Sequence, residues 1–130
     1  MKLLLVDDHA VVRSSLRAML ELTTPFEIVG DASNGRQALE RMREVKPDVV
    51  IMDAHMPVMD GAEATRAIKQ RWPDVCVLAF TATGELRRVA PMLRAGAAGW
   101  VLKGQPREEL VASILGSAEG NPRLGTRGRG

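Results

Sequence analysis

The sequence predicts an α/β fold: a doubly wound, five-stranded parallel sheet with helices on both faces. Five short apolar runs alternate with amphipathic stretches along the whole chain. The runs are partly β-branched and mostly lack an alternation of polar and apolar residues, which is typical of strands buried on both faces. At 130 residues, the chain is long enough for one domain with a core of its own.

Each element follows from a local pattern. The apolar runs that predict strands are, in chain order, Leu3–Val6, Phe26–Val29, Val49–Met52, Val75–Phe80 and Trp100–Leu102. Between them, apolar residues recur at helical spacing, and they predict helices over roughly residues 9–22, Gly35–Val45 and Gly61–Arg71. Prolines stand where helices are expected to end or begin, at Pro47, Pro73 and Pro106.

Composition excludes several classes of protein. The single cysteine, Cys76, cannot form an internal disulfide, which indicates a reducing, cytoplasmic setting. The first apolar run stops at two carboxylates, far short of a signal peptide, and no run approaches the ~20 residues of a membrane span. The net charge of +2 comes from a tail with three arginines, so residues 1–120 carry −1 and give no basis for nucleic-acid binding by the folded part. Residues 119–130 are interpreted as a disordered basic tail or linker remnant.

Polar side chains follow four of the five predicted strands. Asp7 and Asp8 come after the first strand, Asp53 after the third, Thr81 after the fourth and Lys103 after the fifth. In an open parallel sheet, ligands bind beyond the carboxyl ends of the strands. We therefore expect these side chains to converge on one site.

Three neighbouring carboxylates repel one another unless a cation neutralises them. Mg²⁺ suits such a site, because it takes oxygen ligands and typically bridges one or two carboxylates to a phosphate. Lys103 could hold a phosphoryl oxygen as a point charge, and Thr81 offers a hydroxyl to the same group. The implied reaction is attack of the Asp53 carboxylate on phosphorus, which gives an aspartyl phosphate.

The chain resembles the receiver domain of two-component response regulators, the CheY-like family. The resemblance covers roughly residues 1–118 and rests on four pieces in family order and spacing: Leu5–His9, Met52–Gly61, Thr81-Ala82 and Gly96–Lys103. It implies the flavodoxin-like strand order 2-1-3-4-5 with five helices. The stretch Val29–Ala38 is similar to the LuxR/NarL-type subfamily, whose members usually carry a helix-turn-helix output domain.

The resemblance also implies roles for the residues at the strand ends. Asp53 would be the phosphoacceptor, and a histidine kinase would be the phosphoryl donor. The chain would not be an enzyme in the ordinary sense but a domain that catalyses its own phosphotransfer and autodephosphorylation. Mg²⁺ would be held by Asp8, Asp53 and the backbone carbonyl of His55, with Asp7 acting through water. Lys103 would grip the phosphoryl group and Thr81 would signal its presence.

The signalling output is also expected from the resemblance. The switch aromatic of the family falls on Trp100, and phosphorylation would alter partner binding or dimerisation through the last helix or the Trp100 face. The role would be transcriptional control in the cytoplasm. The protein would contact DNA only through an output domain that this chain lacks, and it would not contact a membrane.

Three positions depart from the family pattern. Trp100 replaces the usual Tyr or Phe, and its bulk is expected to hinder an inward rotamer. Gly104 stands where many members have a cis proline, so Lys103 could be placed differently. Pro91 interrupts a helix expected over roughly residues 85–95, which is therefore expected to start late or to be loosely formed.

Three other functions are compatible with parts of the pattern. An aspartyl-phosphate phosphohydrolase needs a second acid two residues after the nucleophile, where this chain has His55. A flavodoxin-like cofactor binder needs a phosphate loop after the first strand, where Asp7 and Asp8 would repel a phosphate. A degenerate receiver that signals without phosphate is the third. His9 and His55 have no evident third metal ligand in the sequence, so solvated loop histidines are favoured over a metal site.

Overall fold

The computed structural model describes residues 1–23 and 25–119. Its five strands are β1 (Lys2–Val6), β2 (Glu27–Ala32), β3 (Val49–Asp53), β4 (Cys76–Thr81) and β5 (Gly99–Leu102). Its five helices are α1 (Ala10–Glu21), α2 (Gly35–Val45), α3 (Gly61–Arg71), α4 (Leu86–Ala95) and α5 (Arg107–Glu119). All strand pairs are parallel and the order is β2-β1-β3-β4-β5, which confirms the predicted fold.

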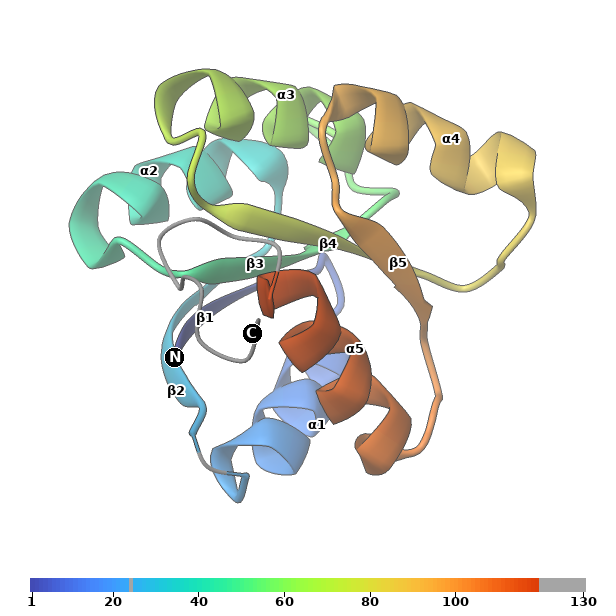
Figure 1. Ribbon diagram of the computed structural model, residues 1–130. Helices are drawn as coiled ribbons and strands as arrows, with labels where there is room; N and C mark the ends of the chain where they lie inside the picture. Colours follow the sequence, from blue (N-terminus) through green and yellow to red (C-terminus); the bar gives the residue numbers. More distant parts are fainter. Residues whose placement is uncertain (24, 120–130) are drawn as a thin grey trace.

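The sheet separates two layers of helices (Figure 1). Helices α2, α3 and α4 cover one face, and α1 and α5 cover the other. Each face has its own apolar core, because successive side chains of the central strands point to opposite sides. Leu4 and Val50 belong to the core beneath α2–α4, whereas Leu3, Leu5 and Ile51 belong to the core beneath α1 and α5. The central strands are therefore buried on both faces, as their continuous apolar runs predicted.

Side-chain caps explain why α2 and α3 begin where the sequence predicted. Asn34 precedes α2 and its Oδ1 accepts a hydrogen bond from the backbone N–H of Gln37 at 2.9 Å. Asp60 precedes α3 and forms a capping box with Glu63, in which each side chain accepts from the other residue's backbone N–H. These caps fix the first residues of the two helices that follow strands β2 and β3.

The expectation that Pro91 delays its helix was wrong. Helix α4 begins at Leu86 and continues through Pro91 to Ala95. Proline has no N–H to donate to the carbonyl four residues earlier, at Arg87, but Val89 and Met92 are buried against the sheet and α3. Tertiary packing on one helical face therefore outweighs the local cost of the proline.

Two further observations concern the predicted tail and the length of the helices. Of the predicted tail, only Glu119 is described, as the last residue of α5, and the remainder lies outside the described residues. Among the described residues, no helix has the length and apolar character needed to cross a membrane.

Candidate functional site

The residues predicted from the strand ends all lie at the carboxyl edge of the sheet. Asp53 is the last residue of β3 and Thr81 the last of β4, whereas Asp7 and Lys103 directly follow β1 and β5. The register places Val6 beside Met52, Asp53 beside Phe80, and Thr81 beside Leu102. Because the four strands are adjacent and parallel, their carboxyl ends meet at one place.

The structure brings the three carboxylates and the ammonium close together. Lys103 Nζ lies 2.9 Å from Asp7 Oδ2 and 3.3 Å from Asp53 Oδ1. Carboxylate oxygens of Asp7, Asp8 and Asp53 and a ring nitrogen of His9 lie within 4.8 Å of one another. Asp7 and Asp53 are only 1% and 3% exposed, so their charges are held away from bulk water.

Asp7 is positioned by contacts on both sides of its backbone. Its N–H donates to the carbonyl of Ala32 at the end of β2, at 3.1 Å. Its carbonyl accepts a hydrogen bond of 2.6 Å from Arg13 Nη1, one turn into α1, and its Oδ1 accepts from the N–H of His9 at 2.9 Å. These contacts fix the β1–α1 turn, so the Asp7 side chain is directed into the site.

Asp53 is positioned by the loop that follows it. Its Oδ1 accepts a hydrogen bond from the backbone N–H of His55 at 3.2 Å. Gly61, the first residue of α3, packs so closely that a Cβ there would overlap the carbonyl oxygen of Asp53 and lie 2.9 Å from the Cα of Ala54. Helix α3 therefore closes tightly against the end of β3, and only glycine allows this approach.

Lys103 reaches the acids although no proline follows it. Gly104 has φ +88°, a conformation that proline cannot adopt and that glycine adopts readily. The backbone N–H of Lys103 donates to the carbonyl of Thr81 at 2.8 Å, and Gln105 Oε1 accepts from the N–H of Leu102 at 3.1 Å. The loop thus has a conformation that a proline at position 104 could not adopt, and it still places the Lys103 ammonium between two carboxylates.

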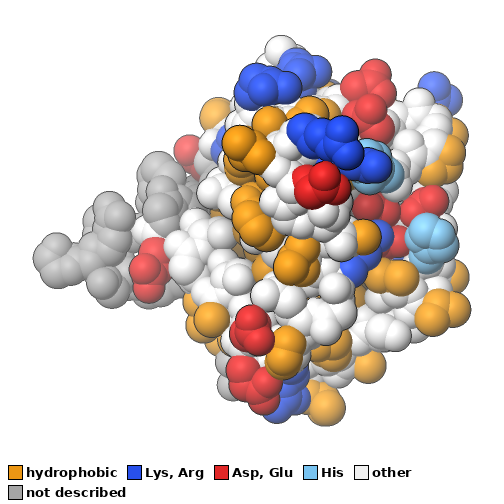
Figure 2. All heavy atoms as spheres, turned by 90° about the vertical axis from the view of Figure 1, so that its right-hand side faces the viewer, with side chains coloured by type: hydrophobic (Ala, Val, Ile, Leu, Met, Phe, Trp, Pro, Cys, Tyr) orange, Lys and Arg blue, Asp and Glu red, His pale blue; other side chains and the backbone are white. Residues whose placement is uncertain are grey.

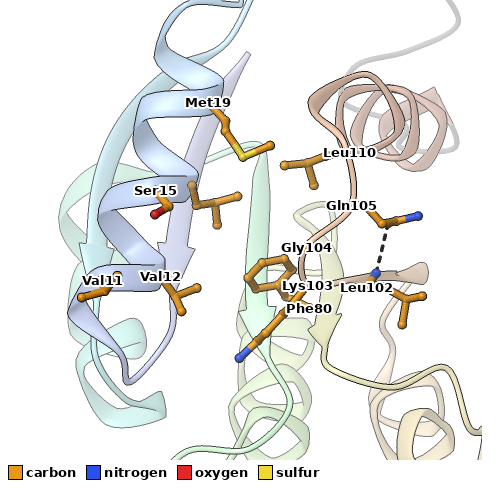
Figure 3. A pocket seen from close by; sticks show the side chains of 11 residues that line it. Val11, Val12, Ser15, Met19, Phe80, Leu102, Lys103, Gly104, Gln105 and Leu110 are labelled. Atoms are coloured by element: carbon orange, nitrogen blue, oxygen red, sulfur yellow. Dashed lines mark hydrogen bonds between the residues drawn. The ribbon is translucent and has the colours of Figure 1, made fainter.

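An apolar pocket between α1 and the β5–α5 loop helps to orient the Lys103 side chain toward the acids (Figure 3). The pocket has a volume of about 220 Å³, and its walls include Val12, Met19, Phe80 and Leu110. The Lys103 stem passes the Phe80 ring, with Nζ 5.4 Å from the ring centroid, and its amine points away from the apolar side chains. An ammonium is poorly solvated in the pocket, so it turns toward the acids.

Thr81 and Trp100, the two residues predicted to form the switch, each have neighbours of their own in this structure. The Thr81 hydroxyl donates to the carbonyl of Thr83 at 3.1 Å and accepts from its N–H at 3.3 Å. Trp100 is 41% exposed, and its ring lies against Gly84, where an added Cβ would meet it at 3.0 Å. This position depends on a glycine at position 84, and the expected hindrance of an inward Trp100 rotamer stays a prediction.

The electrostatics of the site follow from this packing. Burial, and then the charge of Asp7, raise the pKa of Asp53 from 3.8 to about 6, against the opposing effects of the His55 N–H and Lys103. Burial alone would lower the pKa of Lys103, but the hydrogen bond to Asp7 and the charge of Asp53 outweigh it, and the pKa is raised. Lys103 therefore stays charged, whereas the Asp53 carboxylate is destabilised when no cation is added.

These properties fit a divalent cation. Three carboxylates and one ammonium leave an excess of two negative charges in a mostly buried site. No described residue donates a hydrogen bond to the buried oxygen Asp53 Oδ2. An unpaired buried carboxylate oxygen is costly, and the all-oxygen donor set of Asp7, Asp8 and Asp53 suits Mg²⁺.

Three side-chain contacts near the site were not predicted from the sequence. Arg13 binds the Asp7 carbonyl, the His9 ring contacts two carboxylates, and Arg88 Nη1 lies 3.5 Å from His55 Nε2. Figure 2 shows two histidine side chains on this face, beside acidic groups, with a basic side chain against one of them. The spacing of Arg13, four residues after His9 in α1, could have placed both in one turn, but nothing in the sequence pairs Arg88 with His55.

Comparison with known proteins defines the class of this fold and site. Residues 3–115 match the family described as response regulator receiver domain, and the chain belongs to that family. The receiver domain of the putative response regulator NarL from Mycobacterium tuberculosis has a similar structure, with a TM-score of 0.84, 34% identity and coverage of 92% of this chain and 97% of that one.

The resemblance to LuxR/NarL-type receivers is confirmed. A two-component response regulator of the LuxR family from Aurantimonas sp. SI85-9A1 matches with a TM-score of 0.86 and 33% identity, over 95% of this chain and 91% of that chain. The response regulator GacA of Pseudomonas syringae pv. syringae (strain B728a) is 42% identical over 113 residues, which are 87% of this chain and 53% of GacA. The transcriptional regulatory protein LiaR of Bacillus subtilis (strain 168) is 36% identical over 95% of this chain and 58% of LiaR. This chain thus spans about half the length of the curated relatives that it matches.

Proposed function

We propose that this domain is the phosphoacceptor of a two-component system, with Asp53 as the residue that is phosphorylated by a histidine kinase. The observation that carries the proposal is the state of the Asp53 carboxylate. It is 3% exposed, one oxygen is held by Lys103 and the His55 N–H, and the other accepts no hydrogen bond from any described residue. The Asp53 carboxylate is the nucleophile we assign.

The chain's own residues account for binding and alignment. The Asp53 carboxylate attacks the phosphorus of a phosphohistidine, an O–P bond forms, the P–N bond breaks, and the imidazole leaves with the electron pair. Lys103 binds a phosphoryl oxygen, and the Thr81 hydroxyl donates to another once it turns away from the Thr83 carbonyl. Mg²⁺, held by Asp8, Asp53 and the His55 carbonyl with Asp7 acting through water, would neutralise the charge of the carboxylates and the phosphoryl group.

The output follows from the same groups. A Thr81 hydroxyl recruited by the phosphoryl group releases Thr83, which lies just before Gly84, the residue that contacts the Trp100 ring. We propose that this shift alters the face formed by Trp100 and α5, through which the domain binds a partner or a second copy. In the whole protein, a transcriptional output domain beyond this chain would make the contact with DNA, in the cytoplasm.

Intact-protein mass spectrometry tests the assignment. Wild-type chain with acetyl phosphate and Mg²⁺ is expected to gain the mass of one phosphoryl group, whereas Asp53→Asn with Mg²⁺ and wild type with EDTA are expected to gain none. An adduct on the Asp53→Asn variant, or none on wild type with Mg²⁺, would refute the proposal.

The proposal also assigns loss of the phosphoryl group to the domain itself. After removal of the donor, the adduct is expected to decay with a first-order rate that does not depend on protein concentration. Steady multiple turnover of a phosphate ester would instead indicate a phosphohydrolase, the alternative left open by the sequence.

A further inference from the structure

The histidine that directly follows the acid pair lies inside the acidic site. His9 occupies the N-cap position of α1, and its backbone N–H is bound to Asp7 Oδ1 at 2.9 Å. Its ring nitrogen Nδ1 lies 3.0 Å from Asp8 Oδ1 and 3.4 Å from Asp7 Oδ1. The sequence offered no third ligand for a histidine metal site, but the fold supplies three carboxylates.

We infer that His9 makes this acidic site a binding site for a borderline divalent metal such as Zn²⁺, with His9 Nδ1 as a ligand beside oxygens of Asp7, Asp8 and Asp53. The inference rests on the proposed function only in that the same carboxylates are taken to bind a divalent cation. It adds a nitrogen donor and therefore a different choice of metal.

The distances between the donor atoms are close to those around one small ion. Bonds of ~2.0–2.2 Å to one tetrahedral Zn²⁺ place the ligand atoms ~3.3–3.6 Å apart. The contacts of His9 Nδ1 at 3.0 and 3.4 Å lie near this range, and all four donor atoms lie within 4.8 Å of one another. Movements of up to ~1.2 Å would complete the coordination.

A second observation separates this site from a mere cluster of acids. Asp53 is 3% exposed, and its Oδ2 accepts no hydrogen bond from the part of the chain that the structure describes. The ion pairs of Lys103 use Asp7 Oδ2 and Asp53 Oδ1. An incoming ion thus finds a desolvated carboxylate oxygen that Lys103 does not occupy, next to a ring that is 67% exposed and can receive the ion from solvent.

The donor set decides the preference between metals. Mg²⁺ takes oxygen ligands and retains its waters, and it gains little from an imidazole. Zn²⁺ accepts both carboxylate and imidazole ligands, and it binds sites with mixed nitrogen and oxygen donors more tightly than Mg²⁺ does. The His9 ring should therefore strengthen Zn²⁺ binding selectively, and bound Zn²⁺ would compete with Mg²⁺ for Asp8 and Asp53.

Calorimetric titration of the tag-free chain with Zn²⁺ alone and with Mg²⁺ alone, at pH 7.5, tests the inference. The variants are His9→Gln and, as a control, Glu108→Gln, which removes an exposed carboxylate in the first turn of α5. We expect His9→Gln to weaken Zn²⁺ binding by at least about tenfold, as loss of a ligand should exceed the loss of a supporting contact. Mg²⁺ binding should stay within about twofold, and Glu108→Gln should change neither affinity.

A readout on the wild-type chain makes the result independent of how the variants fold. In a long-range ¹H–¹⁵N NMR spectrum, one equivalent of Zn²⁺ is expected to shift Nδ1 of His9 and to leave the His55 ring nitrogens in place. Unchanged Zn²⁺ affinity in His9→Gln, or a shift at His55 instead, would overturn the inference. If wild type binds Mg²⁺ but His9 has no effect on Zn²⁺, only this inference fails; if wild type binds neither ion, the proposed metal site fails with it.

Discussion

Substitution of Asp53 by Asn should stabilise the metal-free protein at neutral pH, although it removes the proposed phosphoacceptor. The pKa of Asp53 is raised from 3.8 to about 6 by burial and by the charge of Asp7. Because the folded-state pKa lies above the unfolded value, the folded protein binds more protons than the unfolded protein between about pH 4 and pH 6. Stability therefore falls as the pH rises through this window, and the full cost of the charged carboxylate is present above it.

The magnitude follows from the shift. About two pKa units correspond to about 3 kcal/mol at 1.36 kcal/mol per unit, and screening by solvent at the mouth of the site reduces this to about 1–2 kcal/mol. Asn has no charge to bury, so Asp53→Asn should raise the free energy of unfolding by that amount at pH 8. At pH 4.5 most of the folded protein already carries a protonated Asp53, so the gain should be clearly smaller.

Urea denaturation in EDTA at pH 4.5 and pH 8, for wild type and Asp53→Asn, measures both quantities. Mg²⁺ provides an internal control at pH 8: at ten times its dissociation constant it should stabilise wild type by about 1.4 kcal/mol and the variant by less. Two results would refute the account of the Asp53 pKa. One is an Asp53→Asn protein that is less stable than wild type at pH 8, and the other is a gain in stability over wild type that is the same at pH 4.5 and pH 8.

Three further substitutions, with Gly116→Ala as a control, test the geometry around the site. Gly61→Ala should lower the free energy of unfolding by about 2 kcal/mol or more, because the new Cβ overlaps the carbonyl of Asp53, whereas Gly116→Ala, in open space on α5, should raise it by about 0.5–1 kcal/mol. Val58→Asn should raise it by about 1 kcal/mol, because Val58 is a β-branched residue at φ +70° with a 69% exposed side chain. Lys103→Gln should lower it by about 2 kcal/mol in EDTA, less than for a fully buried pair, because two buried carboxylates lose their counter-charge.

Thermal or urea unfolding measures all of these effects, and each has its own contradicting result. Equal effects of the two glycine substitutions would mean that the close approach of α3 to β3 is not under steric constraint. A destabilised Val58→Asn would show that the side chain makes contacts that exceed its backbone strain. For Lys103→Gln, a loss that Mg²⁺ does not partly restore would argue against charge repulsion as the cause.

The architecture could be predicted because it is encoded in short stretches of sequence. Buried parallel strands need continuous apolar runs, and helices need apolar residues at helical spacing, so Gly35–Val45 and Gly61–Arg71 were found with their observed bounds. The position of a polar residue directly after a strand is also local information. The topology of a parallel sheet then carries Asp7, Asp53 and Lys103 to one edge, which is why the membership of the site could be anticipated.

Only the tertiary structure decided how these side chains meet. The continuation of helix α4 through Pro91 and the contact of Trp100 with Gly84 depend on packing between elements far apart in the chain. The His9 ring is a local case, because the turn between β1 and α1 sets its distances to the carboxylates of Asp7 and Asp8, the two residues directly before it. Sequence patterns are set by the periodicity of secondary structure, whereas distances between charged atoms are set by long-range packing; the sequence therefore determined which groups gather, and the fold determined which of them touch.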